Sequence, residues 1–145
     1  MQQANLLIKT EMEEKFNEAT NNRPEGHRTL DAAMVTVNLG QFIKQIRDEE
    51  QWKKSDRNAI TIFKSLVMRM VLIALHKDAE MVKHTAKGMI SIHVLEGEIE
   101  FTTSDQTVHV CSGQVLILHE GIEHSVYARQ ETVFLLTLTE KTTGG

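Results

Sequence analysis

The sequence contains one cysteine, Cys111, among its 145 residues, so no disulfide bond can form within the chain. A lone cysteine is typical of proteins in a reducing compartment. Residues 1–8 lack the basic start and the long hydrophobic run of a secretory signal peptide. No segment approaches the ~20 apolar residues that span a membrane, because Arg69, His76 and Lys77 interrupt the most apolar one. These absences predict a cytoplasmic protein without a membrane partner.

Several chemistries are also missing from the sequence. It has no glycine-rich phosphate loop, no Cys-x-x-Cys pair and no serine nucleophile elbow. Its formal net charge of −4 provides no excess of positive charge to attract a phosphate backbone. A transcription regulator would need a helix-turn-helix segment. The helix expected over residues 41–54 has no partner helix to form one. Nucleic acid is therefore not an expected partner.

The length fits one domain with a single hydrophobic core. Apolar residues make up 41% of the chain and charged residues 25%, which is the composition of an ordinary globular protein. We divide the chain into an N-terminal arm (1–30), a strand and helix packed on the barrel (31–57), a β-barrel (58–139) and a tail (140–145).

One helix is expected over residues 41–54, where apolar side chains recur at helical spacing and charged side chains fill the other positions. A first strand is expected over 34–39. In the N-terminal arm, a short helix would place five apolar side chains on one stripe. They are Leu6, Leu7, Ile8, Met12 and Phe16.

From residue 58 onward the hydrophobic pattern alternates, which predicts eight successive strands separated by turns. The expected strands are 60–64, 68–76, 90–95, 98–103, 107–110, 115–118, 124–127 and 133–139. Cys111 falls beside one of them, as a partly buried strand residue. Short strands with regular turns and no βαβ alternation predict a mainly β fold, either a sandwich or a closed antiparallel barrel.

Two segments, 84–97 and 113–128, resemble the two signature motifs of the cupins. In the first, Gly97 matches the closing glycine and His84 the first histidine, while Ala86 and Ile90 stand where the motif has its second histidine and its glutamate. In the second, Gly113, Gly121 and His124 match, His119 replaces the proline and Ala128 replaces the asparagine. The chain is thus similar to small single-domain cupins with degenerate metal motifs.

The resemblance implies a double-stranded β-helix, also called a jelly-roll barrel, here with one N-terminal helix. It also implies a metal site, which in this family has three histidines and one glutamate. Only His84 and His124 hold ligand types here. Since an open divalent site usually needs three protein ligands, His119 or His76 is a candidate third donor. The expected cofactor is one divalent metal (Fe, Mn, Ni or Zn) or none.

Strand alternation places Ile90, Ile92 and Val94 inside the barrel and His93 outside. The same alternation turns His124 inward, and His109 is expected on the surface. The predicted pocket is apolar, with one or two imidazoles in it. Its lining is Ala86, Ile90, Ile92, Val94, Val126, Ala128, Phe134 and Leu136.

Such a pocket suits a small, mostly apolar or aromatic ligand with one polar group. Two functions follow. The first is binding of a small molecule beside an incomplete or absent metal site. The second is a metal-dependent cupin enzyme, an oxygenase or isomerase, that uses His84 and His124 as ligands. A symmetric homodimer is expected from the resemblance, and also because the apolar strand within 67–75 needs to be covered by the helix, the arm or a second subunit.

Overall fold

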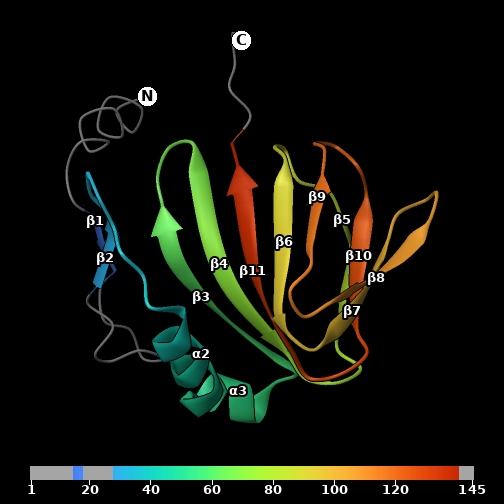
Figure 1. Cartoon of the computed structure of the whole chain (residues 1–145), viewed down its shortest axis with the longest axis horizontal. Helices are drawn as coiled ribbons and strands as arrows, with labels where there is room; N and C mark the ends of the chain where they lie inside the picture. Colours follow the sequence, from blue (N-terminus) through green and yellow to red (C-terminus); the bar gives the residue numbers. More distant parts are fainter. Residues whose placement is uncertain (1–14, 18–27, 141–145) are drawn as a thin grey trace, which may run out of the picture.

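The structure is a computed structural model that describes residues 15–17 and 28–140 (Figure 1). Two larger antiparallel sheets face each other, and two short helices lie outside one end of the barrel. The mainly β, jelly-roll class predicted from the sequence is confirmed. None of the described helices has the length and apolar character needed to cross a membrane.

The helices are α2 (Leu39–Asp48) and α3 (Glu50–Lys54). The strands, in chain order, are β1 (Lys15–Asn17), β2 (Arg28–Asp31), β3 (Arg57–Lys64), β4 (Met68–Leu75), β5 (Glu80–His84), β6 (Ile90–Glu96), β7 (Glu98–Thr102), β8 (Thr107–Cys111), β9 (Val115–Leu118), β10 (His124–Ala128) and β11 (Thr132–Thr139).

Pairing between distant strands builds the barrel. One sheet has the strand order β3-β4-β11-β6-β9 and the other has the order β5-β10-β7-β8, while β1 and β2 pair separately. Each pair of neighbouring strands among the described residues is antiparallel. The last strand, β11, lies between β4 and β6, so the C-terminal strand joins the two halves of its sheet.

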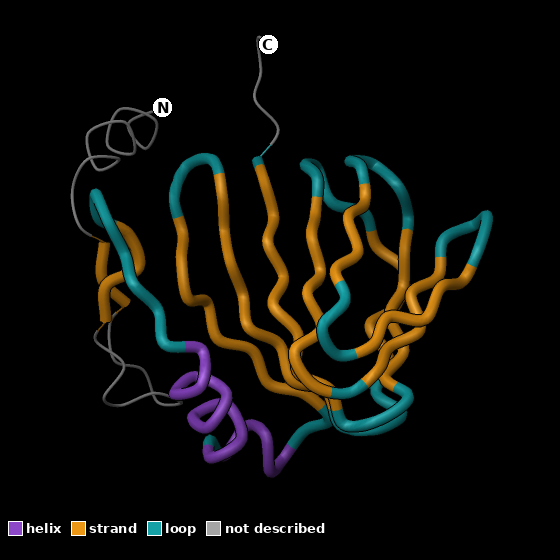
Figure 2. The backbone as a smooth tube through the Cα atoms, in the orientation of Figure 1, coloured by secondary structure: helices purple, strands orange, loops and turns teal. Residues whose placement is uncertain are grey.

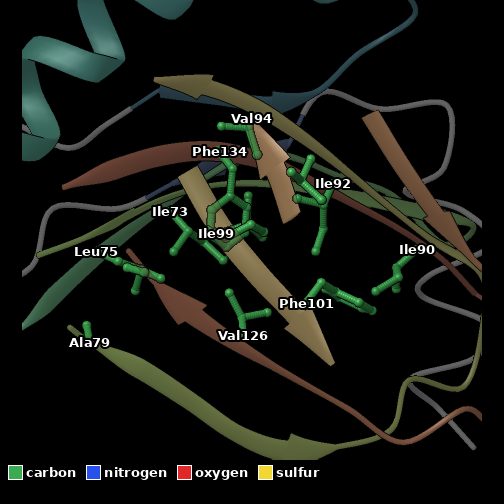
Figure 3. Packing of buried hydrophobic residues seen from close by; sticks show 13 residues of the cluster. Ile73, Leu75, Ala79, Ile90, Ile92, Val94, Ile99, Phe101, Val126 and Phe134 are labelled. Carbon is green, nitrogen blue, oxygen red and sulfur yellow. The ribbon is translucent and has the colours of Figure 1, made fainter. Parts of the chain in front are cut away.

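The space between the two sheets is filled by apolar side chains from both. Ile90, Ile92 and Val94 of β6 are each at most 3% exposed, as the alternating pattern predicts. Figure 3 shows Phe101, from β7 in the facing sheet, and Phe134, from the neighbouring β11, packed among them. This core occupies the middle of the barrel and defines the inner walls of any cavity at its ends.

A second apolar cluster lies on the outer face of β3 and β4. Ile46 of α2 and Trp52 of α3 pack there with Leu72 and Ala74, all buried. The apolar strand within 67–75 was expected to be covered by the helix, the arm or a second subunit. In the structure the helices cover its outer face. The need to cover this strand is then no longer an argument for a homodimer. The homodimer stays a prediction that rests on the resemblance to cupins.

The helical segment differs from the single helix expected over 41–54. It begins at Leu39, where the Asn38 side chain accepts a hydrogen bond from the Gln41 amide, and it breaks at Glu49, whose backbone is extended (Figure 2). The Asn58 amide donates to the Ile46 carbonyl and to the Glu49 carboxylate. These bonds hold the end of α2 against β3, and the chain turns before α3 begins.

The prediction of a strand over residues 34–39 is wrong. Residues 32–38 are irregular and Leu39 already belongs to α2, because Asn38 caps the helix at this point. In the arm, Phe16 lies in β1 rather than on the expected helix stripe, while Leu6, Leu7, Ile8 and Met12 lie outside the described residues.

Three strands, β1, β2 and β5, were not expected from the sequence, and β5 is the one that bears on the site. It is an edge strand in which only Met81 is partly buried, so its residues do not alternate between apolar and polar. This strand matters for the site because His84 is its last residue.

Candidate functional site

A cavity of about 200 Å³ opens at the end of the barrel where β6 and β10 begin and β11 ends. Its inner wall is apolar and comes from both sheets. The apolar lining consists of Ile90, Ile92, Val126, Phe134, Leu136 and Leu138. This end of the barrel lies opposite to the helices (Figure 1). Ile90, Ile92, Val126 and Phe134 of its lining also belong to the buried core.

Two histidines from neighbouring strands meet at one side of this cavity. His84 ends β5 and His124 begins β10, and their Cα atoms are partners in the antiparallel register. Their ring centroids are 4.3 Å apart and the ring planes are inclined by 60°. Sheet pairing therefore brings together the two histidines that the sequence comparison singled out.

Both imidazoles are held in place by backbone carbonyls two residues earlier in the chain. Nδ1 of His84 lies 2.8 Å from the Val82 carbonyl oxygen, and Nδ1 of His124 lies 2.9 Å from the Ile122 carbonyl oxygen. A carbonyl oxygen can only accept, so each Nδ1 carries the hydrogen. When the rings are neutral, each Nε2 is then a hydrogen-bond acceptor or a metal ligand.

His124 is the buried member of the pair. It is 3% exposed, and its ring stacks on Phe101 with centroids 5.2 Å apart and planes 14° from parallel. Burial is the largest influence on its pKa, which is lowered; His84 lowers the pKa further and the bond to Ile122 raises it. His124 is therefore held in its neutral form at pH 7. His84, by contrast, is exposed.

The mouth of the cavity is polar. Lys87 and Glu140 line it with opposite charges, and both side chains belong to exposed residues. Gly88 lies where β11 ends, and a Cβ atom there would stand 1.7 Å from the Thr139 carbonyl oxygen. Glycine is thus required for the loop before β6 to approach β11 this closely.

Six of the eight predicted pocket residues line the cavity: Ala86, Ile90, Ile92, Val126, Phe134 and Leu136. Val94 and Ala128 do not. Each lies four positions further along its strand than Ile90 or His124, roughly 13 Å deeper in the barrel, and is fully buried in the core.

Sequence reasoning missed two apolar lining residues. Leu138 shares the alternation of Phe134 and Leu136 on β11 and could have been found from it. Met81 lies on β5, which has no alternating apolar pattern, so no signal in the sequence pointed to it.

The candidate third donors lie elsewhere. His119 is exposed and lies beside Glu120, with Nδ1 3.6 Å from the carboxylate. His76 stacks on the Trp52 indole, with ring centroids 3.4 Å apart, and its Nε2 lies 2.9 Å from the Trp52 carbonyl oxygen. Neither residue lines the cavity.

The remaining described histidines face away from the barrel interior. His93 alternates with the buried Ile92 and Val94 on β6. His109 is exposed on β8, between the carboxylates of Glu98 and Glu100.

The donor set does not fit a resident divalent cation. Across residues 15–17 and 28–140, no group of three or more His, Cys, Asp or Glu side chains is placed to hold one. At the cavity the imidazole donors are His84 and His124, whereas Ala86 and Ile90 contribute no donor atom. Two imidazoles fall short of the three protein ligands of an open divalent site.

Solved structures are similar to most of this chain. A conserved protein of unknown function from Streptococcus pyogenes is 21% identical, with a TM-score of 0.59 over 88% of this chain and 98% of that one. A cupin-superfamily protein from Desulfitobacterium hafniense is 12% identical, with a TM-score of 0.59 over 88% and 99% of the two chains. A cupin-2 domain-containing protein from Shewanella frigidimarina is 16% identical, with a TM-score of 0.59 over 72% and 95%. No protein family and no curated protein matches in sequence. At these identities the similarity shows a shared fold.

Proposed function

Since this chain shares the fold of small cupin-type domains, we propose that it binds a small, mostly apolar molecule in the barrel cavity, beside an incomplete metal site. The cavity is walled by aliphatic and aromatic side chains and carries a few convergent polar groups, which is the usual composition of a small-molecule site. No bond-making step is assigned to it.

One observation carries this proposal. His84 and His124 are oriented by backbone carbonyls at the side of an otherwise apolar cavity, without a third donor among the described residues. Fixed imidazoles of this kind orient a ligand through hydrogen bonds. The apolar wall supplies the larger part of the contact area.

The second candidate is a metal-dependent cupin enzyme, an oxygenase or isomerase, with His84 and His124 as ligands. The observation in its favour is the pair of Nδ1 bonds, because a metal-bound histidine typically donates its other ring N–H to a carbonyl or carboxylate. Against it stands the missing third donor. We therefore derive no reaction step through a metal.

Elemental analysis of the purified, untagged protein separates the two functions. We expect less than stoichiometric iron, manganese, nickel and zinc, both as purified and after incubation with each ion and desalting. A full equivalent that is retained by the native chain and lost in a His84→Ala, His124→Ala double variant would instead establish the metal-dependent candidate. A His119→Ala variant is the matched control, since His119 is an exposed histidine outside the cavity.

The proposed setting is a homodimer in the cytoplasm. Light scattering during size-exclusion chromatography gives the mass of the species in solution, and a monomer at micromolar concentration would contradict the dimer.

A further inference from the structure

The histidines determine which polar group the cavity accepts. Each Nδ1 is occupied by a backbone carbonyl, so the ring atom left for a ligand is Nε2. On the buried ring of His124, Nε2 has no hydrogen-bond partner among the described residues. A donor on a ligand that enters the cavity can pair with this acceptor in place of solvent.

A carboxylate is the wrong partner for this acceptor. Its oxygens would face the lone pair of a neutral imidazole and would lose their hydration beside apolar walls. The charged side chains that line the cavity in the described part of the chain are Lys87 and Glu140, and these lie at the mouth with opposite signs. The charged side chains of the lining thus provide no net charge to hold an anion beside His124.

The cavity volume limits the apolar part of the ligand. It is about 200 Å³, whereas an engineered apolar cavity of roughly 150 Å³ is known to hold benzene. One six-membered ring with a small substituent therefore fits. A two-ring compound would protrude through the mouth between Lys87 and Glu140.

We propose that the ligand is a neutral single-ring compound with a hydroxyl donor, of the phenol class, whose hydroxyl donates to Nε2 of His124. The ring lies against Ile90, Val126 and Phe134, and its edge faces the mouth. This inference rests on the small-molecule binding proposed above and deepens it by assigning the chemical class of the ligand.

Three probes of nearly equal size test the inference: phenol, toluene and benzoate. Binding to the native chain at pH 7.5 is followed by ligand-observed NMR titration. We expect phenol to bind, toluene to bind about tenfold more weakly because it leaves the acceptor unpaired, and benzoate to bind more weakly still. If toluene or benzoate binds as tightly as phenol, the inference is wrong while cavity binding stands.

Two variants locate the effect. His124→Leu should reduce phenol affinity to that of toluene and leave toluene binding unchanged or tighter, since only the acceptor is lost. Leu136→Trp should fill the cavity and abolish binding of every probe that the native chain binds. Binding that survives Leu136→Trp would place the probes elsewhere and overturn the inference. If the native chain binds none of the probes, both the phenol class and the proposed small-molecule binding fail. Tight binding of toluene or benzoate, by contrast, refutes the phenol class alone.

Discussion

His84 and His124 lie on adjacent strands with their rings edge to face, 4.3 Å between centroids, and each donates Nδ1–H to the backbone carbonyl of the residue two positions earlier in the chain. This arrangement fixes the rings without any outside partner. The pair is therefore preorganised for a ligand, and its chemistry is set by what surrounds it. Ala86 and Ile90 leave the surroundings apolar.

The first prediction concerns pH and His124. The unfolded chain has the ordinary histidine pKa of 6.5, and the pKa is lowered in the fold, chiefly by burial. Between the two values the unfolded chain binds more protons, so protonation favours unfolding. The contribution of His124 to stability is full above pH 6.5 and decreases as the pH falls through 6.5 toward the folded pKa.

Urea denaturation at pH 7.5 and 5.5 measures this effect. The native chain should lose more unfolding free energy between the two pH values than a His124→Gln variant does. His119→Gln is the control, because the side chain of His119 is 74% exposed, and it should keep the pH dependence of the native chain. Equal losses in the native chain and in His124→Gln would contradict the prediction.

The second prediction concerns the attachment of α2 to the barrel. Asn58 is 5% exposed and donates to the Ile46 carbonyl and the Glu49 carboxylate, both at 2.9 Å. Asn58→Ala leaves these acceptors without their donor, and we expect a loss of about 1–3 kcal/mol of unfolding free energy. Thermal or urea unfolding provides the measurement. Lys54→Ala, an exposed change on α3, should stay within about 0.5 kcal/mol of the native chain.

The barrel could be predicted from the sequence because its strands alternate. Ile90, Ile92 and Val94 have the period of two that a half-buried strand needs, and the structure buries all three. His84 and His124 could be paired only through the resemblance, since β5 lacks an alternating apolar pattern.

The break at Glu49 depends on a contact that no local pattern encodes. Asn58, on the next strand, donates through its side chain to the Ile46 carbonyl near the end of α2 and to the Glu49 carboxylate. Likewise, His76 was a candidate donor by position along its strand, and only the packing of α3 shows its ring against Trp52. Long-range contacts of this kind override the periodicity of a single segment.

The third prediction concerns the reactivity of Cys111. Its thiol donates to a Glu98 carboxylate oxygen at 3.4 Å, and this bond is the main reason that the pKa of Cys111 is raised. A raised pKa reduces the fraction of thiolate, which is the reactive form. Glu98→Gln should therefore increase the rate of iodoacetamide alkylation at pH 8 several-fold, as followed by mass spectrometry.

Glu100→Gln is the matched control for Glu98→Gln. Glu100, like Glu98, forms ion pairs with His109 and Arg129, whereas the Cys111 thiol donates to Glu98. Alkylation should stay close to the native rate in this variant. An equal acceleration in both variants would show that the thiol responds to the general charge of the sheet face rather than to its bond with Glu98.

The fourth prediction rebuilds a metal site. Ala86 and Ile90 line the cavity with His84 and His124, so an Ala86→His, Ile90→Glu double variant would place four donor side chains around one space. Without metal the new glutamate is a buried charge without a partner, and the variant should be less stable than the native chain. Zinc should restore stability, because a ligand that binds only the folded state shifts the unfolding equilibrium toward it.

Thermal unfolding with and without equimolar zinc measures the gain. The double variant should show a rise in Tm of several degrees with zinc, and the native chain should show little or none. Adding His84→Ala to the double variant removes one donor and should reduce the rise. If zinc raises the Tm of the native chain as much as that of the double variant, then His84 and His124 already bind the ion with a donor from outside the described residues. In that case the incomplete site proposed for this chain would be wrong.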